Sequence, residues 1–167
     1  MVTKERFRKG MTFQQYLDQM TTNKERFLQN IQEIKIRPED REVLKRFEKP
    51  LKLLVITEDW CGDALHNFPV LAKLVDGLPN IEMRVFLRDQ NPDLMDQYLN
   101  QGIFRSIPVF AFFDENMNEL ARSIERPPVV TEFLDKKIRE LRTALRQQHQ
   151  EEWRQAVVDE VRALLKA

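Results

Sequence analysis

The sequence contains a single cysteine, Cys61, among its 167 residues. One thiol cannot form a disulfide within the chain, and such sparse use of cysteine is typical of proteins from reducing compartments. No apolar run approaches the roughly 20 residues that a membrane-spanning helix needs. The basic N-terminal residues are not followed by the apolar segment of a secretory signal. We therefore expect a cytoplasmic protein that does not span a membrane.

Neither sign of charge is in excess, because 27 Lys and Arg residues balance 27 Asp and Glu residues. Proteins that bind nucleic acid or anionic membranes usually carry a basic excess, so neither partner is predicted. Histidine is also scarce. The two histidines, His66 and His149, are far apart and, with one cysteine, do not supply the four ligands of a tetrahedral zinc site within one chain. A cluster shared between two chains with an added thiol is the open alternative. We expect no bound metal and no other cofactor.

The strongest pattern in the chain runs from residue 51 to residue 76. The apolar segment 51–57 is too short for a helix and predicts a buried strand. After a turn at 58–60, apolar residues recur at helical spacing, which predicts a helix over about 61–76. Cys61 would then lie in the first turn of that helix, where free N–H groups and the helix dipole favour the thiolate. We predict that its pKa lies below the free-thiol value of about 8.5.

Carboxylates surround this cysteine in the sequence. Glu58 and Asp59 precede it and Asp63 follows it. Polar neighbours predict a partly exposed sulfur, although the same negative charges would oppose a thiolate and raise its pKa in part. The alternative is that Cys61 is an unreactive small residue in a turn.

The remaining elements predict an α/β fold. Strands are expected over 81–87, from 107, and around 120–124, with a short helix after Pro92 and a long helix from about 129, bent near His149. A helical connection makes the first two strands parallel, and a turn at 114–118 adds antiparallel strands. We therefore expect a central mixed sheet of four to five strands flanked by helices. The expected units are an N-terminal helical extension (1–37), this domain (38–145) and a C-terminal helical extension (146–167).

Two patterns concern the extensions. Thr22 and Glu25 are spaced as a capping box at the start of a helix that follows them. Near the C-terminus, Trp153 begins an apolar stripe at helical spacing that continues with Val157, Val161 and Leu164. This stripe either packs on its own chain or forms a homodimer through the terminal helices, and the sequence leaves both readings open.

Three features together resemble the thioredoxin family over roughly residues 38–145. They are Trp60-Cys61-Gly62, Pro69 eight positions after the cysteine, and the segment 102–109, which ends in Ser-Ile-Pro-Val before an apolar strand. The resemblance implies a thioredoxin-like fold in which Pro108 follows a cis peptide bond and packs beside Cys61.

The same resemblance implies a set of site residues. Cys61 would be the catalytic thiol, and Ile107 would present its backbone to an extended partner segment. The other residues expected to contact the partner are Trp60, Gly62, Asp63 and Pro108.

Two residues depart from the family pattern. Ala64 stands where thioredoxins carry the second, resolving cysteine. Without that thiol, a mixed disulfide at Cys61 must be resolved by a thiol from another molecule. Val55 stands where many thioredoxins have a buried aspartate that helps to move protons between the two thiols. The two departures are mutually consistent.

The resemblance therefore implies thiol–disulfide redox chemistry through one cysteine, with protein or low-molecular-weight thiols and disulfides as partners. The competing interpretation is a redox-inactive thioredoxin-like module that binds proteins through the surface around Trp60 and Pro108. A peroxidase-like or transferase activity is less well supported, because the usual threonine–cysteine pattern of peroxidases is absent.

Overall fold

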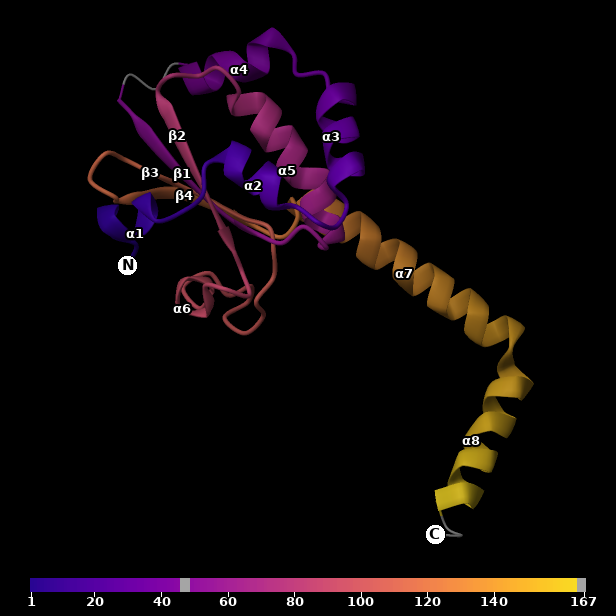
Figure 1. The fold of residues 1–167 in the computed structure, drawn as a ribbon. Helices are drawn as coiled ribbons and strands as arrows, with labels where there is room; N and C mark the ends of the chain where they lie inside the picture. The colour runs from indigo at the N-terminus through magenta and orange to yellow at the C-terminus, as the bar shows by residue number, and fades with distance from the viewer. Residues whose placement is uncertain (46–48, 165–167) are drawn as a thin grey trace. The chain divides into compact units, whose positions relative to one another are not determined.

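The computed structural model describes residues 1–45 and 49–164 (Figure 1). Its contacts divide the chain into two compact units, Met1–Arg126 and Pro127–Ala167, which are described separately below. The first unit joins the N-terminal helices to the sheet. The expected division at 37/38 and 145/146 is not the division that these contacts make, and it stays a prediction about domains.

A four-stranded mixed sheet forms the centre of the first unit. Its strands are β1 (Leu51–Thr57), β2 (Ile81–Leu87), β3 (Val109–Phe113) and β4 (Glu119–Ile124), in the order β2-β1-β3-β4. β1 pairs with β2 in parallel, and β3 pairs antiparallel with both β1 and β4. The parallel pair needs a helical crossover, which α5 (Gly62–Val75) supplies. The sequence-based prediction of a mixed sheet is confirmed, with four strands.

One face of the sheet is covered by α2 (Phe13–Gln19), α3 (Lys24–Glu33) and α5. Phe68 of α5 is fully buried, and its ring centroid lies 5.4–5.6 Å from those of Phe13, Tyr16 and Phe27. Aromatic pairs at such distances add stability beyond the area that they bury. The N-terminal helices therefore belong to the core of the first unit. α4 (Pro38–Lys45) follows them and leads toward β1.

The opposite face is covered by two short helices, α1 (Lys4–Arg8) and α6 (Pro92–Met95). Phe7 of α1 and Leu94 and Met95 of α6 are buried in one cluster with Leu54 and Ile56 of β1. Because β1 is the second strand of four, its side chains are buried on both faces, which explains the unbroken apolar run at residues 53–56.

The predicted capping box at Thr22 and Glu25 is wrong. α3 begins after Asn23, which has a left-handed conformation (φ 58°) and makes no side-chain cap. The backbone N–H of Thr22 instead donates to a carboxylate oxygen of Asp59 at 2.9 Å. The segment before α3 is therefore held by Asp59, a residue 37 positions away in the sequence, and not by a local capping box. A capping box does occur at α2, where Thr12 caps the helix.

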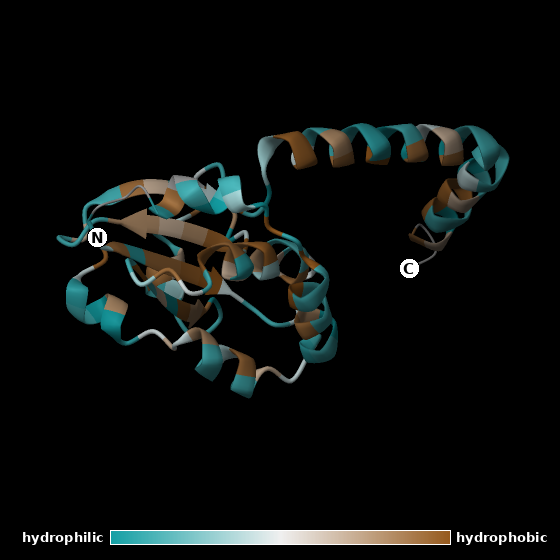
Figure 2. Ribbon diagram, turned by 90° about the horizontal axis from the view of Figure 1, so that it is seen from above, coloured by the Kyte–Doolittle hydropathy of each residue, from teal (hydrophilic) through white to brown (hydrophobic). Residues whose placement is uncertain are grey.

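The second unit consists of α7 (Pro128–Gln148) and α8 (Gln150–Leu164). His149 alone separates them, as expected from the predicted bend. Hydrophobic positions recur along both helices (Figure 2), and no side chain of either helix is buried. Within the described residues, no helix combines the length and the apolar character needed to cross a membrane.

Candidate functional site

Cys61 is the N-cap residue of α5. Its carbonyl oxygen accepts the N–H of Leu65 at 3.0 Å, and its sulfur accepts the N–H of Ala64 at 3.5 Å. The extended backbone of Cys61 (φ −76°, ψ 122°) is typical of an N-cap. The predicted location of the cysteine at the start of the helix is confirmed.

The peptide bond between Ile107 and Pro108 is cis, as the resemblance implies. It lies next to the thiol, because Cys61 Sγ donates to the carbonyl oxygen of Ile107 at 3.5 Å. The carbonyl oxygen of Pro108 accepts the N–H of Glu125 at 2.8 Å, which ties the residues after β4 to the same place. Two segments 46 residues apart in the sequence thus meet at one sulfur atom.

The predicted exposure and pKa of Cys61 are both wrong. The residue is only 9% exposed, and burial raises the pKa of its thiol above the usual value. The N–H groups of Ala64 and Asp63 and the charge of Arg88 lower the pKa, while the Asp63 carboxylate raises it further. The helix N-terminus therefore acts in the predicted direction, but desolvation outweighs it.

The neighbouring carboxylates have other partners, which explains the error. Glu58 is itself buried and accepts the N–H of Asp89 at 2.8 Å. Asp59 accepts the N–H groups of Thr21 and Thr22 at 2.7 and 2.9 Å. These acidic residues hold the backbone around the turn together and do not make a polar opening around the sulfur.

Trp60 lies at the surface beside the thiol and is 47% exposed. The guanidinium carbon of Arg88 lies 4.7 Å from the centroid of its ring, a distance typical of a cation–π contact. Sequence reasoning missed Arg88. The available signal was its place directly after β2, because the ends of parallel neighbouring strands meet at one edge of a sheet.

Four charged and polar residues are linked at the first turn of α5 and are called the charged wall below: Asp63, Asn100, Glu125 and Arg126. Asp63 and Arg126 form an ion pair with Oδ2 3.6 Å from Nε, and Arg126 also pairs with Glu125. Asn100 donates to Glu125 at 2.8 Å. Burial favours the neutral form of Glu125, but hydrogen bonds from Ser106, Arg126 and Asn100 outweigh it and lower the pKa of this carboxyl. The wall connects the loop before β3 to α5.

The residues that the resemblance implies are adjacent to the sulfur in sequence or space. Trp60, Gly62 and Asp63 flank Cys61, and Ile107 and Pro108 lie across from it. Their roles in partner binding stay predictions. Ala64, at the position of the missing resolving cysteine, is buried and contributes its N–H to the sulfur.

Within residues 1–45 and 49–164, no three His, Cys, Asp or Glu side chains are grouped to hold a metal ion. The candidate site consists of the buried thiol of Cys61, the loop with the cis peptide bond before Pro108, and the exposed ring of Trp60.

A family model described as thioredoxin matches residues 10–146, so the chain belongs to the thioredoxin family. Similar solved structures include a protein of unknown function from Pseudomonas aeruginosa. It is 24% identical over 89% of this chain and 92% of its own, with a TM-score of 0.70. An HIV epitope scaffold is 27% identical over 77% of this chain and 81% of its own, with a TM-score of 0.66. A search of curated proteins finds no match. The thioredoxin-like fold predicted from the sequence is confirmed.

Proposed function

We propose that this member of the thioredoxin family exchanges thiols and disulfides through Cys61 alone. The observation that carries the proposal is the position of its sulfur. Cys61 Sγ caps α5 and lies 3.5 Å from the carbonyl oxygen of Ile107, beside the cis peptide bond of Pro108. A partner disulfide reaching this sulfur would lie between Trp60 and the loop of Ile107.

The proposed reaction has two exchange steps. The Cys61 thiolate attacks a partner disulfide, so that a Cys61–partner bond forms, the partner's S–S bond breaks, and the other partner sulfur leaves as a thiolate. Ala64 has no thiol, so the thiolate of a second molecule attacks the partner sulfur of the mixed disulfide. A disulfide between these two sulfurs forms, the bond to Cys61 breaks, and Cys61 leaves as a thiolate. The proposal assigns this chemistry to the cytoplasm, where low-molecular-weight thiols are kept reduced and available.

The protonation state of Cys61 sets the expected rate. Burial raises the pKa of the thiol, so only a small fraction is thiolate at neutral pH. Its S–H group donates to the carbonyl of Ile107, an interaction that favours the protonated form. We therefore expect slow exchange at neutral pH that accelerates as the pH rises.

A second candidate function is a binding module without redox activity. It is favoured by the low exposure of Cys61 beside the exposed ring of Trp60. The two candidates are distinguished by comparing wild type with Cys61→Ser for covalent capture of partners from lysate and for non-covalent binding. Thiol chemistry predicts that covalent capture is lost in Cys61→Ser. Unchanged binding together with no covalent capture by wild type would support the module.

The proposal also includes a second copy of the chain as a partner of the C-terminal unit. Apolar side chains follow one face of α7 and one face of α8. They are more than a third exposed and comprise Val130, Ile138, Leu141 and Leu145 on α7 and Trp153, Val157, Val161 and Leu164 on α8. An antiparallel helix pair within one chain needs a loop of about 2–5 residues. Since His149 alone links α7 and α8, their stripes cannot cover each other along their length.

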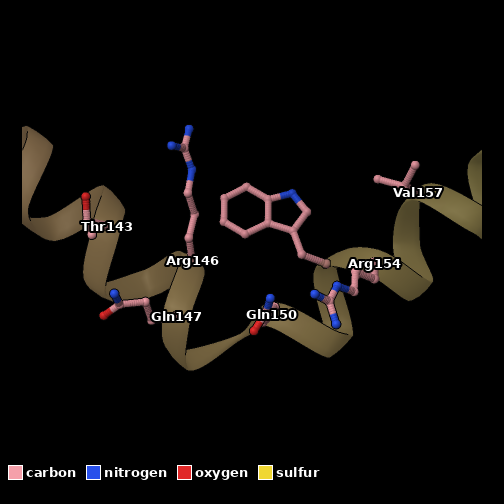
Figure 3. Close-up of a pocket in the computed structure, with 7 residues that line it drawn as sticks. Thr143, Arg146, Gln147, Gln150, Arg154 and Val157 are labelled. Atoms are coloured by element: carbon pink, nitrogen blue, oxygen red, sulfur yellow. The ribbon is translucent and has the colours of Figure 1, made fainter.

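Charge complementarity supports pairing between copies. α7 carries five basic and three acidic side chains, whereas α8 carries two basic and four acidic ones. α7 of one copy would therefore attract α8 of the other. A pocket of about 480 Å³ at the bend is lined by Arg146 from α7 and Arg154 and Val157 from α8 (Figure 3), and offers space for an apolar side chain of the second copy.

A further inference from the structure

Arg88 connects two segments that are separate in the sequence. It directly follows β2, and its backbone N–H donates to the carbonyl oxygen of Thr57 at the end of β1 at 3.0 Å. This bond continues the strand pairing to the edge of the sheet. The turn of residues 58–60, called the Trp60 turn below, begins there. The side chain of Arg88 is therefore placed by backbone that is itself well anchored.

The guanidinium of Arg88 makes three contacts at this edge. It lies over the ring of Trp60 at 4.7 Å, and Nε donates to Asp89 Oδ1 at 2.8 Å. Nη1 points to the carbonyl oxygen of Arg105 at 3.4 Å. Arg105 lies three residues before Pro108, so one planar cation contacts both sides of the thiol site.

We propose that Arg88 is a positioning residue that holds the Trp60 turn against the loop before Pro108. This inference rests on the proposed function of the thiol site, because a partner that reaches Cys61 would pass between the turn that carries Trp60 and the loop before Pro108. Arg88 touches neither the sulfur nor a partner in this role.

Arginine suits the role better than lysine. A guanidinium is planar, stacks on an aromatic face and directs several N–H donors at once, whereas an ammonium is a compact charge without a plane. Lysine at this position would retain the positive charge near Cys61 but would lose the stacking geometry. The two contributions of Arg88, geometry and charge, can therefore be measured separately.

The charged groups near the sulfur determine how the charge would be detected. Asp63 raises and Arg88 lowers the pKa of the Cys61 thiol, and Glu58 and Asp89 lie beside Arg88. Loss of the positive charge should therefore raise the thiol pKa further. Alkylation should then be severalfold slower at a given neutral pH.

The experiment compares Arg88→Lys and Arg88→Gln in a Trp153→Phe background, which leaves Trp60 as the single tryptophan. Two quantities are measured: the emission and acrylamide quenching of Trp60, and the pH profile of Cys61 alkylation by iodoacetamide. The matched control is Arg105→Gln, because Arg105 is a neighbouring arginine whose guanidinium pairs with Asp96 at the surface.

We expect both Arg88 variants to change the Trp60 emission and to make its quenching easier. The alkylation profile should move to higher pH in Arg88→Gln and stay near wild type in Arg88→Lys. Arg105→Gln should change neither quantity. A Trp60 signal in Arg88→Lys equal to that of the control would overturn the inference, including in the case that Arg88→Gln does not fold.

These measurements do not depend on disulfide exchange. If Cys61 forms no mixed disulfide but both Arg88 variants change Trp60 as expected, the proposed function fails and the positioning role stands. If Cys61 forms mixed disulfides and the Arg88 variants match the control, the positioning role fails alone.

Discussion

The thiol of Cys61 and the carbonyl oxygen of Ile107 are hydrogen-bonded across 3.5 Å, with the cysteine as donor. A thiolate at this place would face the lone pairs of the carbonyl and would lack the surrounding water that stabilises an anion. The same contact that brings the sulfur beside Pro108 therefore disfavours its ionised form. The location of the thiol beside the cis-proline loop and its raised pKa are thus two consequences of one arrangement.

Replacing Ala64 by cysteine should restore a dithiol site. The N–H of Ala64 donates to Cys61 Sγ at 3.5 Å, so a thiol at residue 64 would lie one helical turn from the sulfur. We expect wild type to reduce insulin disulfides weakly or not at all, and Ala64→Cys to do so with turnover when a reductant is present. Because Ala64 is 1% exposed, the added atom should also lower the free energy of unfolding by about 1–3 kcal/mol.

The control for this gain is the double variant Cys61→Ser, Ala64→Cys, which keeps the added atom but has a single thiol. Insulin reduction by this double variant equal to that of Ala64→Cys would show that Cys61 takes no part. Brisk turnover by wild type would contradict the single-thiol account.

Asp59 should anchor the N-terminal segment to the Trp60 turn. Its Oδ2 accepts the N–H groups of Thr21 and Thr22, and its carbonyl oxygen accepts from the side chain of Asn23 at 3.0 Å. Asp59→Ala removes the carboxylate bonds and should lower the free energy of unfolding by about 0.5–1.5 kcal/mol, the net contribution of a typical hydrogen bond, because water can reach the exposed N–H groups of Thr21 and Thr22. Hydrogen exchange at residues 21–23 should accelerate, whereas Glu25→Gln should leave it unchanged. Equal exchange in both variants would refute the anchor.

The elements of the first unit could largely be predicted because their signals are local. The apolar run 51–57 and the helical spacing after Cys61 each lie within one element, and both predictions are confirmed. The burial of Cys61 could not be predicted. Glu58 and Asp59 indicated a polar surrounding, but their partners Asp89 and Thr21 lie 31 and 38 residues away.

Arg88 was missed for the same physical reason. Its contacts with Trp60 and Arg105 cross from one strand end to two separate loops, and no periodicity within a single element encodes them. The burial of Cys61 likewise depends on separate segments, because it lies in one cluster with Leu94 and Ile107. The helix start and the neighbouring charges, taken without desolvation, predict a shift of the thiol pKa of the opposite sign.

Pairing of the C-terminal units should depend on the apolar stripe of α8. Val157→Asp places a charge in the stripe and should convert a concentration-dependent dimer to a monomer in light scattering with size-exclusion chromatography. Gln155→Ala is the control, because residue 155 lies on the opposite face, about 200° around the helix from Trp153. A wild-type protein that is monomeric at all concentrations would show that a second copy of the chain does not cover the apolar stripes of α7 and α8. A dimer that persists in Val157→Asp would reject this surface.

The most direct test of the account is the rate at which Cys61 forms a mixed disulfide with bis(2-hydroxyethyl) disulfide, followed by intact mass at several pH values. This uncharged reagent leaves the pH dependence to the protein thiol. We predict one adduct per chain, absent in Cys61→Ser, at a rate that rises with pH and is still rising above the free-thiol value of about 8.5. An adduct that forms on the unfolded chain but at no pH on the native protein would contradict the account.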